Sequence, residues 1–301
     1  TCTVTPPRVK RAWRGCSPPS RALMTNSNRT PLSLLLGLLL AAPLLGGATC
    51  SSRPDPKARE QAAIHYDLGV QSMRSCDARG ALSEYRKAIE LDPELELAHH
   101  ALGLLYHLSF ADQASAIVHY QKAITLQPKF SEAYTNLANV YLDQGRYDEA
   151  IALYEKALSD ILYRTPFIAE NNLGWCYYKK GEVQTAIAHI RSALVANAQF
   201  CLGHRNLGLI YGESGDPQKS ADAFAQYVKH CPEMPDAHFR YGAALLKLQD
   251  TEGARREFQT CSVRPEPPAN PPADEQKGCR KAQEYSIIEE CQKYLRLLEQ
   301  Q

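Results

Sequence analysis

Small and apolar residues recur through most of the chain at near-constant distances, within stretches that have the hydrophobic period of helices. Most rounds start with a Leu-Gly or Leu-Ala pair. A small residue, a large apolar residue and a second small residue follow at constant offsets. The starting pairs include Leu68-Gly69, Leu137-Ala138, Leu173-Gly174 and Leu207-Gly208. Because the rounds are about 34 residues long, the pattern predicts a repeated unit of two antiparallel helices.

This spacing resembles that of the tetratricopeptide repeat (TPR). Small residues at positions 8 and 20 let the two helices pack closely, a large residue at position 24 fills the space beside them, and a Pro at position 32 ends the second helix. We expect an all-α fold, a right-handed TPR solenoid of about six helix-turn-helix repeats with a C-terminal capping helix. The expected repeats are residues 62–95, 96–130, 131–166, 167–200, 201–234 and 235–268.

Two repeats are longer than the others, and a different pattern follows the last one. The second repeat has one extra residue, and the third has two and places Leu162 where other repeats have Pro. Residues 269–275 form a Pro-rich linker. Residues 276–301 then predict the capping helix, which covers the last repeat with a polar outer face. Its apolar side at near-helical spacing is Tyr285, Ile288, Cys291, Leu295 and Leu298.

Composition and charge exclude several classes of protein. With 301 residues, 44% hydrophobic and 22% charged, the chain has an ordinary globular composition, which argues against wholesale disorder or a polytopic membrane protein. Its net charge of +1 offers no basic footprint for a nucleic acid. That average conceals two parts: the first 49 residues contain six basic side chains and no acidic one, so the rest of the chain is mildly acidic.

The basic leader has the order of an export signal. Residues 1–23 are interpreted as a doubtful upstream extension, the alternative being a genuine N-terminal tail. Residues 24–49 start at a Met and contain the apolar run 32–45, which is too short and too Pro-interrupted for a membrane span. They end in small residues before Cys50, as bacterial lipoprotein signals do, although Gly47 and Thr49 depart from the usual lipobox.

Lipidation of Cys50 is therefore expected, with residues 50–61 as the tether to the repeats. Two alternatives remain open at this point: cleavage after Ala48 without a lipid, and an uncleaved anchor. All three place the repeats outside the cytoplasm. The expected location is the periplasmic face of a bacterial outer membrane, or, without the lipid, the soluble periplasm.

Seven cysteines follow Cys50, so at least one lies outside any intrachain disulfide. Cys201 and Cys231 occupy positions 1 and 31 of one repeat, which lie at the same end of an antiparallel hairpin, and we expect them to bond. We expect Cys261 to pair with Cys279 and attach the capping helix. No Cys or His spacing predicts zinc.

Histidines recur in the repeat register rather than in a catalytic pattern. Position 4 of four repeats is occupied by His65, His99, His204 and His238, for which a packing role is expected. His100 and His107 share one helix face, where no acidic partner is expected beside them. Since no catalytic, nucleotide-binding or metal motif is found, we expect a protein that is not an enzyme and takes no cofactor, metal, nucleic acid or small-molecule substrate.

Function is expected on the concave surface, which positions 2, 5, 6, 9, 12 and 13 of the first helices line in a TPR solenoid. Asn recurs at position 6, where amides can hold a peptide backbone, and Trp175 with Tyr178 can form an anchor pocket. The alternatives are that Asn at position 6 is a consensus feature and that the aromatic side chains pack internally. The carboxylate clamp of chaperone-binding TPR proteins is absent. The candidate partner-binding residues are Tyr66, His100, Leu104, Asn136, Asn139, Asn172, Trp175, Tyr178, Arg205, Asn206, Phe239 and Arg240.

A lipoprotein-type signal followed directly by six TPRs resembles the type IV pilus pilotins, the PilF/PilW family and its Tgl relatives. The segments that carry the resemblance are Tyr66-Asp67-Leu68-Gly69, 172–181 and Phe239-Arg240-Tyr241-Gly242. It implies an outer-membrane lipoprotein that binds secretin subunits and assists their assembly for type IV pilus biogenesis and motility. A general periplasmic TPR scaffold for another cell-envelope complex is the alternative.

Overall fold

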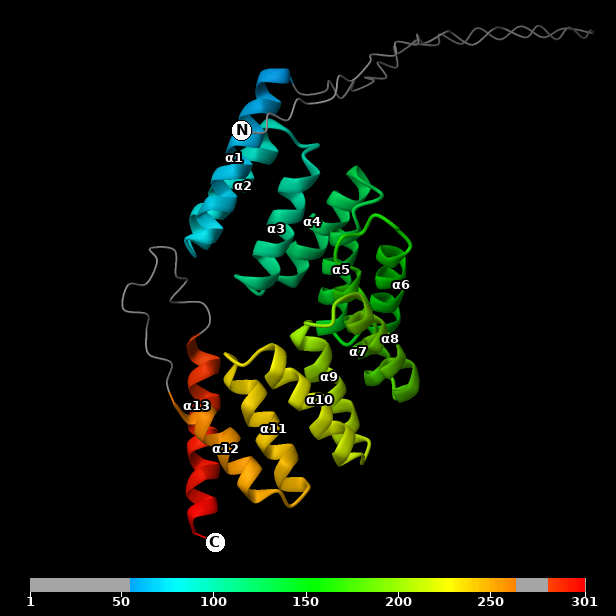
Figure 1. Ribbon diagram of the computed structural model, residues 1–301. Coiled ribbons are helices and arrows are strands. Elements are labelled where there is room, and N and C mark those ends of the chain that lie inside the picture. The colour runs from blue at the N-terminus through cyan, green and yellow to red at the C-terminus, as the bar shows by residue number, and fades with distance from the viewer. Residues whose placement is uncertain (1–54, 264–280, 301) are drawn as a thin grey trace, which may run out of the picture. The chain divides into compact units, whose positions relative to one another are not determined.

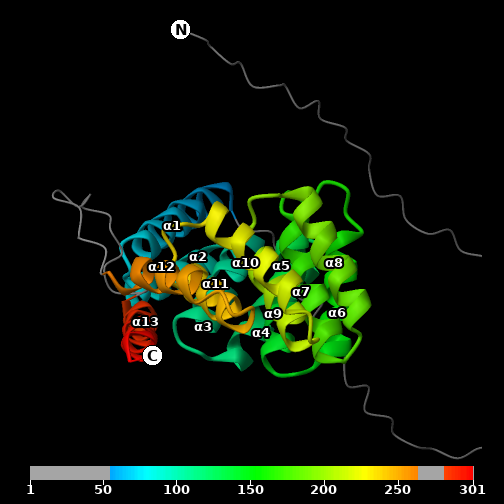
Figure 2. The same ribbon diagram turned by 60° about the horizontal axis from the view of Figure 1, so that its bottom comes forward.

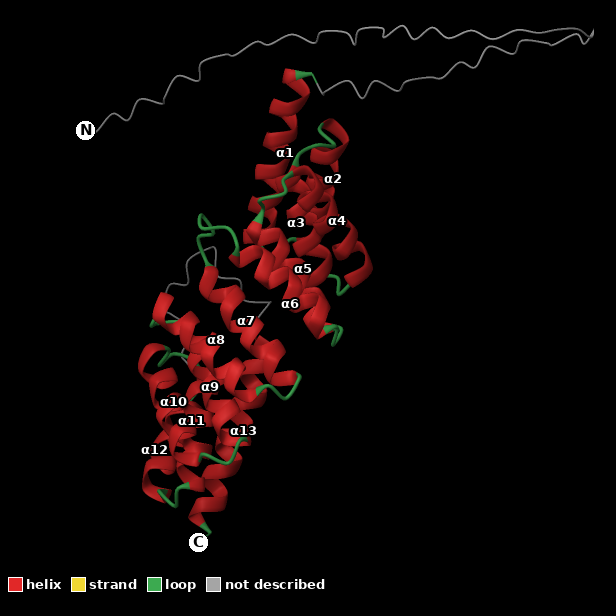
Figure 3. Ribbon diagram, turned by 90° about the vertical axis from the view of Figure 1, so that its right-hand side faces the viewer, coloured by secondary structure: helices red, strands yellow, loops and turns green. Residues whose placement is uncertain are grey.

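The computed structural model describes residues 55–263 and 281–300, which consist of helices joined by short loops (Figures 1 and 3). The helices are α1 (Pro56–Arg74), α2 (Ala78–Leu91), α3 (Glu96–Leu108), α4 (Gln113–Leu126), α5 (Ser131–Asp143), α6 (Tyr147–Leu158), α7 (Pro166–Lys179), α8 (Val183–Ala196), α9 (Cys201–Glu213), α10 (Pro217–His230), α11 (Pro235–Lys247), α12 (Thr251–Ser262) and α13 (Lys281–Glu299). Within the described ranges, none of them is long and apolar enough to cross a membrane.

Several expected segments fall outside the part of the chain that the structure describes. They are the upstream residues 1–23, the signal 24–49, the lipidation site Cys50 and the linker 269–275. The expected tether, 50–61, is wrong over its second half, because α1 starts at Pro56. A proline in the first helical turn favours this start, since its fixed φ suits the helix and its missing N–H has no partner there in any case.

The helices pack in consecutive pairs, α1 with α2 through α11 with α12. Each second helix also packs against the first helix of the next pair, and α3, α5, α7 and α9 contact one another in succession. This is the arrangement of a solenoid, in which each unit touches only its neighbours. The predicted all-α solenoid of six helix pairs is therefore confirmed, with α13 in the place of the capping helix.

Close approach within each pair depends on the small residue at position 8. A Cβ atom added to Gly103 would lie 2.5 Å from the ring of Tyr120, and one added to Gly208 would lie 2.5 Å from the ring of Phe224. Real Cβ contacts are never that short, so the large residue at position 24 rests directly on the glycine backbone. The same pairing occurs in the other units at Gly69 and Tyr85, Ala138 and Tyr154, Gly174 and Ile190, and Gly242 and Phe258.

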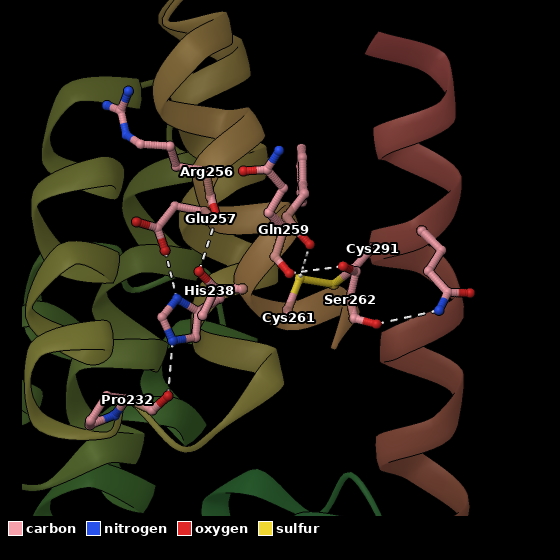
Figure 4. The surroundings of a disulfide bond; sticks show 11 residues. Pro232, His238, Arg256, Glu257, Gln259, Cys261, Ser262 and Cys291 are labelled. Atoms are coloured by element: carbon pink, nitrogen blue, oxygen red, sulfur yellow. Dashed lines mark hydrogen bonds and ion pairs between the residues drawn. A yellow bond between two sulfur atoms is a disulfide. The ribbon is translucent and has the colours of Figure 1, made fainter. Parts of the chain in front are cut away.

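Histidines at position 4 tie three of the units to the loops before them. His99, His204 and His238 each contact the backbone carbonyl six residues earlier, at 2.9 to 3.2 Å. His238 also bonds the Glu257 carboxylate at 2.6 Å, and Figure 4 shows it held between Glu257 and the Pro232 carbonyl. The carboxylate raises the pKa of His238. These contacts give the position-4 histidines the structural role expected from the sequence.

Two disulfides join helices in the C-terminal half. Cys201 is bonded to Cys231, the pair that the repeat positions predict, with their Cα atoms 6.2 Å apart. Cys261 is bonded to Cys291, with a Cα separation of 6.0 Å (Figure 4). The expected pairing of Cys261 with Cys279 is therefore wrong. The partner is a residue in the middle of α13, because α13 lies alongside α12 and brings Cys291 beside the end of that helix.

The capping helix α13 packs on both α11 and α12, and Figures 1 and 2 both show it beside α12. Ile288, Cys291 and Leu298 are buried on its inner side, as their spacing predicts. The ring of Tyr294 stacks on Phe258 at a centroid distance of 5.0 Å, and so covers the large residue of the last pair. α13 thereby buries the apolar surface that a further repeat would otherwise cover.

Candidate functional site

The twelve partner-binding candidates all lie on the first helices of the pairs, α1, α3, α5, α7, α9 and α11. We call the surface formed by positions 2, 5, 6, 9, 12 and 13 of these helices the first-helix face. Because successive first helices contact one another from α3 to α9, side chains at equivalent positions of adjacent units come within hydrogen-bonding distance. The structure brings most of the candidates together in two groups.

The first group is a chain of side-chain amides, which we call the amide ladder: Asn136, Asn139, Asn171, Asn172 and Asn206. Its contacts run across three helices. Asn206 donates to Asn171 at 3.0 Å, Asn171 to Asn172 at 2.9 Å, Asn172 to Asn139 at 2.9 Å and Asn139 to Asn136 at 3.4 Å. The ladder ends where the Asn136 Nδ2 lies 2.8 Å from the Nε2 of His100 on α3.

Every amide in the ladder donates in the same direction, from α9 toward α3. Bonds aligned in this way polarise one another and strengthen the chain. Each amide carries two N–H donors, and the ladder uses one of them, so the half-buried Asn136 and Asn139 keep a donor for another molecule, whereas the amide of Asn172 also interacts with the Tyr154 hydroxyl. Asn206 and Asn171 are buried, so Asn206 supports the ladder from beneath rather than presenting its amide to a partner.

The second group begins with the aromatic pair on α7. The rings of Trp175 and Tyr178 lie 5.1 Å apart, and the Lys179 ammonium lies 4.9 Å from the Trp175 ring. The Tyr178 hydroxyl bonds the Glu213 carboxylate on α9. Burial and that carboxylate raise the pKa of Tyr178 to about 12, so its hydroxyl remains a neutral donor.

Arg205 on α9 and Arg240 on α11 share one carboxylate. Their Nε atoms lie 3.0 Å and 2.8 Å from the same oxygen of Asp236, which the Tyr227 hydroxyl also approaches at 3.4 Å. Each guanidinium uses only its Nε in the hydrogen bonds of the described residues, so both pairs of Nη nitrogens are available. Asp236 thus fixes two arginine side chains in adjacent units. The group of two arginines and one aspartate has a net charge of +1.

A cavity of about 240 Å³ opens between α9 and α11 beside these groups. Its lining combines apolar and charged side chains: Gly208, Leu209, Gly212, Glu213, Ser220, Phe224, Phe239, Arg240, Ala243, Ala244 and Lys247. The sequence candidates Phe239 and Arg240 are among them. Sequence reasoning missed Glu213, Asp236 and Lys247, although they occupy positions 13, 2 and 13 of the same groove register.

Family models match most of the helical region as tetratricopeptide repeats. The matches cover residues 79–109 and 112–145, 130–196, and 205–262. The chain belongs to the TPR proteins.

The TPR chain is similar in sequence to the BBSome complex member BBS4 of Bos taurus, with 27% identity over 196 residues. That match covers 64% of this chain and 36% of BBS4, so the chain spans about a third of that relative. Its fold is similar to that of PilW, a type IV pilus biogenesis factor, with a TM-score of 0.62 and 24% identity over 67% of this chain and 92% of PilW. Pseudomonas aeruginosa PilF gives a TM-score of 0.61 and 17% identity over 68% and 92%.

The N-terminal TPR units present a more apolar part of the first-helix face. Tyr66 packs on Tyr85 at a centroid distance of 5.9 Å, and Leu104 is partly buried. His107 bonds Asp143 of the next unit at 2.8 Å, so the expectation that it lacks an acidic partner is wrong. The contact joins positions 12 and 13 of adjacent units.

Within the described residues, no cluster of three or more His, Cys, Asp or Glu side chains is suited to a metal ion.

Two equivalent tyrosines of this TPR array predict opposite responses to loss of their hydroxyl. Tyr154 donates to Asn139 of the amide ladder at 2.5 Å, whereas Leu104 occupies the equivalent position in the preceding unit. The Tyr120 hydroxyl is therefore buried without a hydrogen-bond partner among the described residues. We expect Tyr154→Phe to lower the free energy of unfolding by about 1 kcal/mol and Tyr120→Phe to leave it unchanged or raise it. Urea denaturation of both variants checks this, and equal losses would contradict it.

Proposed function

We propose that this TPR protein is an adaptor that binds an extended segment of a protein partner along its first-helix face. The amide ladder is the observation that carries the proposal, because it fixes half-buried amide donors in a row across two successive units, on α5 and α7. Those donors suit the carbonyl groups of a peptide backbone. The aromatic pair and the cavity at the end of the row supply a site for a side-chain anchor.

We further propose that the adaptor is a lipid-anchored pilotin, attached through Cys50 to the periplasmic face of the bacterial outer membrane, and that its partner is a secretin subunit. The leader that ends at Cys50 and the two disulfides support an extracytoplasmic location, because structural disulfides persist in oxidising compartments. The fold likeness to PilW and PilF is compatible with this role. A scaffold for another cell-envelope complex is the second candidate.

Complementation of a deletion strain tests the proposal. The readout is the amount of secretin multimer on gels of unboiled membranes. We expect the wild-type chain to restore multimers and the double variant Trp175→Ala, Arg205→Ala to fail, since it removes the aromatic anchor and one of the paired arginines. The control is Val118→Ala, Arg256→Ala, which removes one apolar side chain and one arginine from exposed positions of second helices. A Cys50→Ser chain, followed by fatty-acid labelling, tests the anchor.

The outcomes separate the parts of the proposal. Unchanged multimers in the deletion strain would rule out the pilotin role and favour the scaffold alternative. Full complementation by the double variant would rule out the first-helix face as the partner site. Label that persists in Cys50→Ser would rule out Cys50 as the lipidated residue.

A further inference from the structure

Charged side chains gather at the α9–α11 end of the first-helix face with an excess of cations. The cationic groups there are Lys179, Arg205, Arg240 and Lys247, and the anionic ones are Glu213 and Asp236. Both carboxylates already accept hydrogen bonds, Glu213 from Tyr178 and Asp236 from the two arginines. This end of the face is therefore positive, on a chain whose repeat region is mildly acidic overall.

The arginines are fixed in a way that leaves their carboxylate-binding ends open. Because Asp236 binds the Nε of both Arg205 and Arg240, it holds the two side chains while the Nη nitrogens keep their donors. A planar guanidinium held in this way is suited to a carboxylate, which it binds with two parallel hydrogen bonds. Lys247 adds an exposed ammonium that forms no ion pair within the described residues.

Directly beside these cations, the cavity has an apolar floor. Phe224, Phe239 and Leu209 line it together with two alanines, and its volume of about 240 Å³ accommodates one large apolar side chain. The amide ladder begins on the same helix, α9, and continues toward α3. A bound segment therefore continues beyond the cavity instead of ending there.

We propose that the segment bound at this end is acidic, with one large apolar residue in the α9–α11 cavity and adjacent Asp or Glu side chains on Arg240, Arg205 and Lys247. This inference rests on the proposed adaptor function and specifies the chemistry of the partner. The carboxylates are side chains within the segment rather than a chain terminus, since the ladder requires the peptide to continue.

Fluorescence anisotropy with synthetic peptides and the full chain tests the proposal. The probe is an eleven-residue peptide with Phe between Asp and Glu residues, amidated at its C-terminus so that it has no terminal carboxylate. We expect it to bind about tenfold more tightly than a version with Lys in place of the acids, and than a version with Ser in place of Phe. Its affinity should fall as salt is raised, because the charges lie at an exposed rim.

Reversing the charge of Lys247, at the exposed edge of the α9–α11 cavity, gives a sharper comparison of the two peptides. Lys247→Glu should weaken binding of the acidic peptide about tenfold and increase binding of the Lys peptide, whereas Lys156→Glu on the exposed side of α6 should change neither. Lys247 is exposed, so thermal unfolding of this variant should match the wild type. That measurement separates a binding effect from a folding effect.

Three results would overturn the inference: equal affinity for the acidic and Lys peptides, binding only when the peptide has a free C-terminal carboxylate, or equally tight binding of a thymidine oligonucleotide. None of them would affect the adaptor function if Trp175→Ala, Arg205→Ala abolishes complementation. Conversely, peptide binding that follows the expected pattern, combined with full complementation by that variant, would leave the acidic site intact and remove its link to secretin assembly.

Discussion

Gly103→Leu should lower the free energy of unfolding by about 3 kcal/mol or prevent the second helix pair from forming. A Cβ atom at this position would lie 2.5 Å from the ring of Tyr120, whose side chain is fully buried. Overpacking of this kind typically costs about 1 to 3 kcal/mol, and Leu adds three more carbon atoms beyond Cβ. The gain of about 1 kcal/mol from replacing a glycine inside a helix does not offset it. Urea denaturation measures the loss.

A double-mutant cycle tests whether the contact with Tyr120 is the cause. Tyr120→Ala alone leaves a cavity and should cost about 3 to 5 kcal/mol, but the new Leu at position 103 partly fills that cavity in the double variant. We expect the double variant to be more stable than the sum of the single losses by at least about 1 kcal/mol. Additive losses would contradict the proposed contact. Gln121→Leu, on the exposed side of α4, should change stability by less than about 0.5 kcal/mol.

The same contact explains why the fold was predictable from the sequence. A helix pair can approach closely only where position 8 is small and position 24 is large, so the packing requirement is visible as a residue spacing. Gly103 with Tyr120 and Gly208 with Phe224 carry this information locally, within one unit. Once each unit is recognised, the order of the units follows from the chain itself.

Contacts between units were predicted less well, because the residues involved are not related by the spacing within one repeat. Asn136 and Asn172 were predicted to bind a partner, but the contact of Asn136 with His100 and the bond from Asn172 to Asn139 follow only from the stacking of α3, α5 and α7. Similarly, Arg205 was predicted to bind a partner, but its hydrogen bond to Asp236 of the next unit has no signal within one repeat.

The position of the capping helix α13 was also predicted less well than the helix pairs. The repeat register predicts that the last helix pair needs a cover, but it does not determine how far the covering helix slides along that pair. Cys261 is bonded to Cys291, near the middle of α13, because that helix lies alongside α12. Ring packing by Tyr294 on Phe258 and the hydrogen bond from Arg255 to the Leu298 carbonyl set this position. Neither contact has a signal in the repeat pattern.

Acidification from pH 7 to pH 5 should destabilise the protein through His100, which accepts the hydrogen bond at the end of the amide ladder. Burial lowers the pKa of His100 to about 4, and its Nε2 accepts the bond from Asn136 in the neutral form. In the unfolded chain the imidazole titrates near 6.5, so below that pH the unfolded state takes up a proton that the folded state does not. The stability contributed by the neutral ring is therefore present above pH 6.5 and is lost as the pH falls toward 4. The resulting loss in the free energy of unfolding is about 2 kcal/mol at pH 5 and about 3 kcal/mol below pH 4.

His100→Gln should make the loss of stability between pH 7 and pH 5 smaller, because an amide at the same place cannot be protonated in this range. His119, whose pKa burial also lowers to about 4, keeps part of the pH dependence. His238→Gln provides a control of opposite sign. Glu257 raises the pKa of His238, so its contribution to stability is present below pH 6.5 and is lost as the pH rises through its folded-state pKa. Its replacement should therefore cost more stability at pH 5 than at pH 8. Urea denaturation of the three proteins at pH 5, 6, 7 and 8 measures both slopes. An unchanged pH dependence in His100→Gln would contradict the assignment of this share of the acid destabilisation to a neutral, buried His100.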